Sequence, residues 1–148
     1  LLRSAIQLLG LEARRAGVEL VFQAGSAPVM VRVDEDQLRQ VLINLVINAL
    51  QAVSRGGRIE LHAGLDDGTA RVTVEDDGPG IAPDVAASMF KPFFTTKEKG
   101  TGLGLAIAAR IVREHGGTIT VLRSTLGGAR FDVKLPVDLD RAPEEETG

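Results

Sequence analysis

Residues 59–81 read IELHAGLDDGTARVTVEDDGPGI, and this stretch constrains the architecture more than any other. Apolar side chains occupy alternate positions before and after Asp66-Asp67-Gly68, which is the period of a strand with one buried face. An Asp-Gly turn between two such runs is typical of a β-hairpin. The second run passes into a loop of aspartates and glycines, Asp76–Ile81. The stretch therefore predicts two antiparallel strands that lead into a glycine-rich loop.

A long helix is predicted before this hairpin. Asp34 fits an N-cap, and Gln37 three residues later completes the pattern of a capping box. Good helix formers continue to about Val53, and Gly56-Gly57 ends the run. We therefore expect a helix over residues 34–53.

The flanking sequence completes one α/β domain. We expect a helix over residues 1–16, short strands at Val18–Ala24 and Val29–Val33, a short helix around Asp84–Met89, a helix over Gly102–Glu114 and a last hairpin at Thr118–Arg123 and Ala129–Leu135. Strands outnumber helices, and most strand connections favour antiparallel pairing. The predicted fold is a two-layer α/β sandwich, with one mixed, mostly antiparallel sheet covered by helices on one face. We assign residues 1–136 to this domain and predict that residues 137–148 form a disordered acidic tail.

Composition narrows the classes of protein to consider. The 148 residues are 44% apolar, enough for one core, and contain no cysteine, tryptophan or tyrosine. Disulfides and thiolate metal sites are excluded, and the two histidines, His62 and His115, are far apart in the sequence and give a zinc site little support. A bound metal should therefore be a hard cation on oxygen ligands. The net charge of −3 comes from interspersed signs, which gives nucleic-acid binding little support. We expect a soluble, cytoplasmic and monomeric domain without membrane contact, cut from a longer protein whose upstream part precedes the first helix.

Six polar side chains form a narrow stripe along the predicted helix over residues 34–53. They are Gln37, Gln40, Asn44, Asn48, Gln51 and Arg55. Apolar side chains cover most of the remaining helix surface. An unpaired buried amide costs about 1–3 kcal/mol, so the stripe either faces solvent or meets polar partners. Periodicity alone leaves both interpretations open.

The aspartates that follow the hairpin differ in orientation. Alternation places Asp76 on the core side of its strand and Asp77 on the outer side. An inward carboxylate needs hydrogen-bond donors, and the amino group of a ligand could supply one. Gly78 and Gly80 would let a flat ring approach the backbone, because they have no Cβ. The alternative is an ordinary Asp-Gly turn.

A second glycine-rich segment, Gly100–Leu105, opens the last predicted helix. Backbone N–H groups and the positive end of the helix dipole form a phosphate site at such a position. The segment lacks the preceding strand of a dinucleotide fingerprint and the Gly-Lys-Ser/Thr ending of a P-loop. Alone, it indicates only an anion site.

Five segments in a fixed order give the chain a resemblance to a known family. They are Asn44/Asn48, Asp76-x-Gly78-x-Gly80-Ile81, Phe90–Lys97, Gly100–Leu105 and Gly127-Gly128. In this order they match the N, G1, F, G2 and G3 boxes, and residues from about 17 to 136 resemble the catalytic domain of sensor histidine kinases. The wider superfamily includes gyrase B and the heat-shock chaperone ATPases. The resemblance implies a Bergerat-type fold that binds ATP and Mg²⁺. It also implies transfer of the γ-phosphate to a histidine on a dimerisation and phosphoacceptor domain, with a response regulator downstream.

The resemblance also implies roles for particular residues. Asn48 would supply an oxygen ligand to Mg²⁺, Asp76 would accept from the adenine amino group, and Lys97 would lie near the γ-phosphate. Asn44 and Lys97 would be the catalytic residues. The nucleotide-binding residues implied are Asn48, Asp76, Gly78, Gly80, Ile81, Phe93, Thr96, Lys97, Thr101, Gly102, Leu103, Gly104 and Leu105.

The chain departs from the family pattern in two ways. The position three residues after Asn48, often basic in the family, is Gln51, which puts more weight on Lys97 and Lys99. The phosphoacceptor box is absent, because His62 lies on the polar side of a strand and His115 belongs to a His-Gly-Gly element that the family uses structurally.

Other activities of the same superfamily remain as alternatives. Relatives that hydrolyse ATP carry a glutamate base at the position of Asn44, whose amide cannot accept a proton usefully near neutral pH. An ATPase, a serine or other protein kinase, and a nucleotide sensor without catalysis are the competing interpretations.

Overall fold

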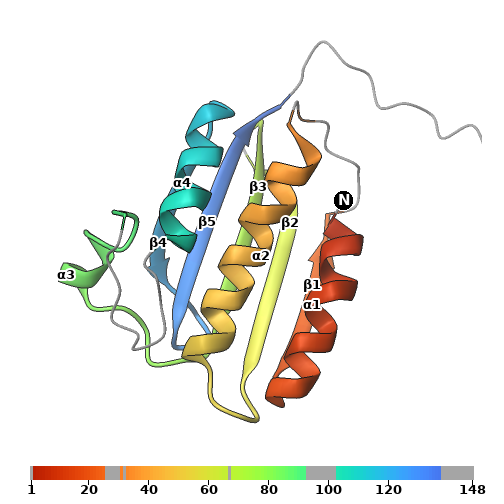
Figure 1. Ribbon diagram of the computed structural model, residues 1–148, viewed down its shortest axis with the longest axis vertical. Coiled ribbons are helices and arrows are strands. Elements are labelled where there is room, and N and C mark those ends of the chain that lie inside the picture. The colour runs from red at the N-terminus through yellow and green to blue at the C-terminus, as the bar shows by residue number, and fades with distance from the viewer. Residues whose placement is uncertain (1, 26–30, 32, 67, 93–102, 138–148) are drawn as a thin grey trace, which may run out of the picture.

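The structure is a computed structural model that describes residues 2–25, 31, 33–66, 68–92 and 103–137, and for residues 2–4 it describes the backbone alone. The elements, in chain order, are α1 (Leu2–Ala16), β1 (Glu19–Ala24), α2 (Glu35–Ala52), β2 (Arg58–Asp66), β3 (Thr69–Asp76), α3 (Pro83–Ala86), α4 (Gly104–Glu114), β4 (Thr118–Arg123) and β5 (Ala129–Pro136). Helices α1, α2 and α4 lie across one face of the sheet (Figure 1).

The strands form one mixed sheet in the order β1-β2-β3-β5-β4. Strands β1 and β2 are parallel, and the other three pairs are antiparallel. The hairpin β2–β3 pairs Leu61 with Val74, and Gly68 in its turn has a φ of +74°, a conformation that glycine adopts without strain. The predicted two-layer α/β sandwich with a mostly antiparallel sheet is confirmed.

The hydrophobic core lies between the helices and the sheet. Among its most deeply buried members are residues of α1, α2, α4 and the three central strands: Leu9, Val41, Leu42, Leu45, Val46, Ala49, Ile59, Leu61, Val74, Ala108, Val112, Phe131 and Val133. Successive side chains of a strand point to opposite faces, so the residues between these apolar positions line the face of the sheet that the helices leave open. That face is polar, because Glu60, His62 and Glu75 alternate with core residues.

Asp34 caps α2 as predicted, but its second hydrogen bond differs from the capping box. The carboxylate Oδ1 of Asp34 accepts from the Gln37 N–H at 3.1 Å. The Asp34 N–H donates to Nε2 of His115 at 3.1 Å, so His115 takes the place that a capping box gives to the Gln37 side chain. Nδ1 of His115 then donates to the Ile111 carbonyl at 2.7 Å, because a neutral imidazole has one donor and one acceptor nitrogen. His115 therefore joins the end of α4 to the start of α2, in keeping with the structural role expected for it.

Other sequence predictions need correction or lie outside the described residues. Val31 and Val33, the described residues of the strand expected at 29–33, lie in no strand. They pack half-buried against the core, and an apolar run alone does not distinguish such packing from a strand. The short helix covers only Pro83–Ala86. Residues 138–148, predicted to be disordered, are outside the described part. Within that part, no helix combines the length and apolar character needed to cross a bilayer.

Candidate functional site

Asp76 ends β3 and is almost completely buried, with 2% of its surface exposed. Its Oδ1 accepts from the N–H groups of Gly78 at 3.0 Å and Ala129 at 3.1 Å. Its main-chain carbonyl accepts from the Gly128 N–H at 3.1 Å. The predicted inward orientation is confirmed, and two backbone donors on one oxygen fix the direction of the carboxylate.

Glycines surround this carboxylate because there is no room for a Cβ. A Cβ on Gly128 would overlap the Asp76 carboxylate and lie 2.7 Å from the Gly78 nitrogen. A Cβ on Gly78 would lie 3.0 Å from the Ala52 carbonyl oxygen and 3.1 Å from Asp76 Oδ1. The loop after β3 and the loop before β5 therefore approach each other backbone to backbone, and Asp76 lies where they meet.

The neighbouring Asp77 is exposed and has a different partner. Its Oδ1 accepts from the Arg58 N–H at 3.1 Å, and its own N–H donates to the Arg58 carbonyl at 3.2 Å. Asp77 thus holds the loop to the start of β2. The two aspartates have separate structural roles, as the alternation of the strand predicted.

The middle of the amide stripe on α2 meets α4. Asn44 and Asn48 are half-buried, whereas Gln40 and Gln51 are exposed. Nδ2 of Asn44 donates to the Gly104 carbonyl at 3.1 Å. The choice that periodicity left open is therefore decided at Asn44, whose amide has a polar partner on another helix.

The N-terminus of α4 lies at this contact. Leu103 is its N-cap residue, and no side chain among the described residues caps the helix there. The first N–H groups of a helix have no partner within the helix, and the dipole gives this end partial positive charge. Such a terminus suits an anionic group.

The two halves of the site lie along one side of α2. Gly78 approaches Ala52 near the end of α2, and Gly104 contacts Asn44 eight residues earlier. At 1.5 Å per residue these contacts are about 12 Å apart along the helix. An acceptor carboxylate at one end and a helix N-terminus at the other complement an extended ligand with an amino group and an anionic group.

The predicted site residues divide into a described group and a group outside it. The described ones are Asn44, Asn48, Asp76, Gly78, Gly80, Ile81, Leu103, Gly104 and Leu105. Among them, Gly80 has a φ of +80°. Ile81 and Leu105 pack half-buried against the core. Phe93, Thr96, Lys97, Thr101 and Gly102, together with Lys99, lie outside the described residues, so their placement stays a prediction. Sequence reasoning missed that the Ala129 and Gly128 N–H groups hold Asp76. The pair Gly127-Gly128 was a signal of close approach, but it did not identify the carboxylate.

A cavity of about 430 Å³ lies elsewhere, on the open face of the sheet. Its lining includes His62, Arg71 and Arg130. Arg71 binds Asp132 through two hydrogen bonds of 2.9 and 2.7 Å, and the hydrogen bond to Asp132 raises the pKa of the guanidinium. The residues that line this cavity include none of the predicted site residues, and they lie on the face of the sheet opposite Asp76.

The chain matches a known protein family over most of its length. Residues 33–139 match the family described as histidine kinase-, DNA gyrase B- and HSP90-like ATPase. The chain is 41% identical over 141 residues to the sensor histidine kinase ZraS of Escherichia coli O157:H7, a match that covers 95% of this chain and 31% of that protein. The chain thus spans about a third of the length of this relative.

Solved structures show the same fold. The nucleotide-free catalytic domain of the histidine kinase ThkA superposes with a TM-score of 0.83 at 34% identity, over 90% of this chain and 88% of that one. Full-length ShkA in complex with AMPPNP has a TM-score of 0.82 at 36% identity, over 92% of this chain and 29% of that one.

Proposed function

The chain belongs to the histidine kinase-, DNA gyrase B- and HSP90-like ATPase family, and from this premise we propose that it binds Mg²⁺-ATP and donates the γ-phosphate to a histidine on a separate phosphoacceptor domain. It is then the catalytic domain of a two-component sensor histidine kinase. The sensor kinases among its relatives support this specific activity over the others of the family.

One observation carries the proposal: two complementary ends of a site lie along α2. Asp76 is a buried acceptor, and it lies between Gly78 and Gly128, where the loop after β3 meets the loop before β5 backbone to backbone. The N-terminus of α4, where the Gly104 carbonyl accepts from Asn44, is the end that binds anions. In this assignment Asp76 accepts from the adenine amino group, and the α4 terminus binds the phosphates with the segment Gly100–Leu105.

The chemistry of the residues fits a magnesium ion bound together with the nucleotide. Asn48 lies one helical turn after Asn44 and is half-buried, and an amide oxygen is a hard ligand of the kind that Mg²⁺ accepts. One amide makes a weak site by itself, so Asn48 would hold the ion together with phosphate oxygens and water. When bound, the ion neutralises phosphate charge during transfer.

Asn48→Ala tests this assignment. It should weaken ATP binding in Mg²⁺ much more than ATP binding in EDTA, as measured by calorimetry. An equal loss under both conditions would make Asn48 structural and exclude the metal role.

The contact of Asn44 argues against hydrolysis as the main activity. An amide is not a proton acceptor near neutral pH, and Nδ2 of Asn44 donates to Gly104. Asn44 therefore positions the phosphate-binding terminus of α4 and does not itself supply a base to activate water. Phosphoryl transfer to a strong nucleophile such as imidazole needs positioning and charge neutralisation more than a base.

The nucleophile, on this proposal, belongs to another part of the kinase. His115 is engaged on both ring nitrogens by Ile111 and Asp34, and His62 lies on the open face of the sheet between two glutamates. We therefore assign the acceptor histidine to a dimerisation domain of the same protein, with a response regulator as the next acceptor and a cytoplasmic location for the reaction.

The deciding experiment mixes this chain with γ-labelled ATP and a second polypeptide that carries the acceptor helices of the full-length kinase. Acid-labile phosphate should appear on the second polypeptide only when both are present. Label on this chain alone would refute the division of labour. Rapid phosphate release without an acceptor would favour the ATPase alternative.

A further inference from the structure

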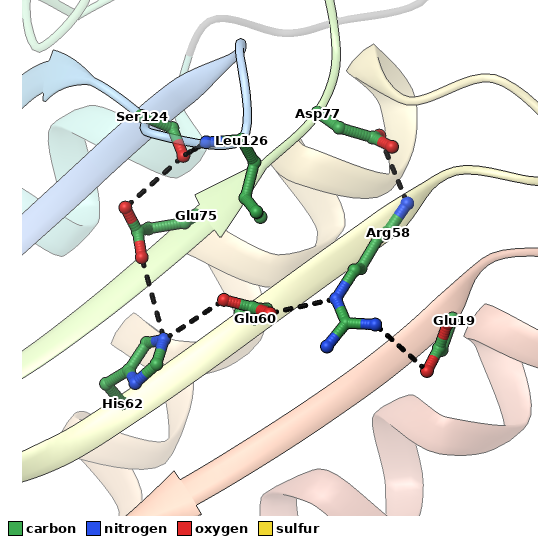
Figure 2. A network of polar contacts seen from close by, with 8 residues as sticks. All are labelled: Glu19, Arg58, Glu60, His62, Glu75, Asp77, Ser124 and Leu126. Atoms are coloured by element: carbon green, nitrogen blue, oxygen red, sulfur yellow. Dashed lines mark hydrogen bonds and ion pairs between the residues drawn. The ribbon is translucent and has the colours of Figure 1, made fainter.

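Three metal-binding side chains converge on the face of the sheet opposite the nucleotide site. They are Glu60 and His62 of β2 and Glu75 of β3, and Figure 2 shows their functional groups turned toward one another. We propose that they form a binding site for a first-row divalent cation such as Zn²⁺. The site is independent of nucleotide binding, because these side chains lie on the face opposite Asp76.

The register of the β2–β3 hairpin places two carboxylates of this cluster next to each other. Glu60 and Glu75 are directly opposite each other in the β2–β3 pairing, where two like charges destabilise a sheet. Their side chains are only 16% and 10% exposed, so solvent screens the repulsion poorly. Arg58 offsets part of this repulsion through its 2.8 Å ion pair with Glu60, and a divalent cation between the two carboxylates would offset more of it.

The separations suit a tetrahedral ion. Nε2 of His62 is 3.3 Å from Oε2 of Glu60 and 3.6 Å from Oε2 of Glu75, and the three ligand atoms all lie within 4.8 Å of one another. With Zn–N and Zn–O bonds of about 2.0–2.2 Å, the edge of a tetrahedron is roughly 3.3–3.6 Å. The distances from His62 therefore need little adjustment, and the cluster contains the nitrogen and oxygen ligands that Zn²⁺ accepts.

Neighbouring groups orient both carboxylates. Oε1 of Glu75 accepts from the Ser124 hydroxyl at 3.2 Å, and Oε1 of Glu60 accepts from Nε of Arg58 at 2.8 Å. In each carboxylate the other oxygen, Oε2, faces His62 (Figure 2). Outer partners of this kind fix the orientation of metal ligands and are a regular feature of metal sites.

The surroundings leave access for the ion and a fourth ligand. His62 is 37% exposed, and both His62 and Glu75 line the cavity of about 430 Å³ on the open face. Three protein ligands with room for water resemble the open coordination of non-structural zinc sites.

The test is a titration of the nucleotide-free chain with Zn²⁺ in competition with a chromophoric chelator. The wild-type chain should bind one ion. His62→Gln and Glu75→Gln should each weaken binding at least tenfold, since even outer-shell changes cost about 10–100-fold. Glu19→Gln is the matched control: Glu19 belongs to the same network through Arg58 at 3.3 Å but supplies no ligand (Figure 2), so its affinity should stay within about twofold of the wild type.

A second measurement separates the proposed site from adventitious binding. Co²⁺ in a tetrahedral site gives strong visible absorption, which should appear with the wild-type chain and Glu19→Gln and be lost in His62→Gln. Circular dichroism of each variant without metal checks that it is folded. The proposal is overturned if no saturable binding occurs, or if folded His62→Gln binds Zn²⁺ as tightly as the wild type. Because no nucleotide is present, either failure leaves the kinase proposal untouched.

Discussion

Replacing Asp76 by asparagine should weaken ATP binding strongly while the fold survives. The asparagine Oδ1 can still accept from Gly78 and Ala129, so the loop keeps both hydrogen bonds. Each bond changes from a charged to a neutral acceptor, which costs roughly 1 kcal/mol, or about 2 kcal/mol of stability in total. Loss of the charged acceptor for the adenine amino group removes a further 1.5–3 kcal/mol or so from binding, a decrease in affinity of roughly tenfold to a hundredfold.

The assay compares ATP with inosine triphosphate by calorimetric titration. Inosine carries a carbonyl where adenine carries its amino group, so wild type should prefer ATP by about tenfold or more, and Asp76→Asn should lose most of that preference. Asp77→Asn is the control, because Asp77 is exposed and bonds only to the Arg58 backbone in the described contacts. Equal losses for the two variants, or a base preference that survives in Asp76→Asn, would refute the assignment of Asp76.

Three further substitutions test other parts of the account. Gly128→Ala should lower the stability of the chain by about 1–3 kcal/mol and should also weaken ADP binding, because the new Cβ would overlap the Asp76 carboxylate. Thermal unfolding and calorimetric titration measure the two effects, and wild-type values in both would contradict the close approach of the two loops. Gly10→Ala, in the interior of α1 with no atom within 4 Å of the new Cβ, should stabilise the chain by about 0.5–1 kcal/mol in denaturant unfolding. The hydrogen bond from Arg58 is the main cause that lowers the pKa of Glu60 from its ordinary 4.5. The ionised Glu60 carboxylate therefore stabilises the fold above about pH 4.5, and this stabilisation is lost as the pH falls through the pKa of Glu60 in the folded chain. In metal-free buffer, Glu60→Gln should therefore be less stable than wild type near pH 7, by no more than about 1 kcal/mol, and the difference should shrink as the pH falls below the ordinary pKa of 4.5. A difference that grows in acid would show the sign to be wrong.

Much of the fold could be predicted because local patterns agreed with it. Alternation fixed the β2–β3 hairpin and the inward side of Asp76, and the N-cap at Asp34 located the start of α2. The run at residues 29–33 was misread because apolar spacing reports burial and not the element that buries the residue. The hydrogen bond from Asp34 to His115 spans 81 positions of sequence, and no local rule of capping could have identified that partner.

The candidate site was predicted less completely than the fold. The residue types at Asn44, Asp76 and Gly104 followed from the sequence, since amide, carboxylate and helix terminus each imply a kind of ligand. Their mutual arrangement required the packing of α2 against α4 and of the β3 loop against Gly128. The cluster on the open face depends on the cross-strand register of Glu60 and Glu75, which the hairpin turn sets but which sequence reasoning did not use.

The proposal that nucleotide binds beside α2 is tested most directly by locating the nucleotide on this chain. Backbone amide resonances should be followed by NMR while Mg²⁺-ADP is added to the isotope-labelled protein. If the nucleotide binds beside α2 as proposed, the largest shifts will occur at Gly78, Gly104 and Ala129, on the helix-covered side of the sheet. The largest shifts at His62 and Arg130, around the cavity on the open face, would contradict it.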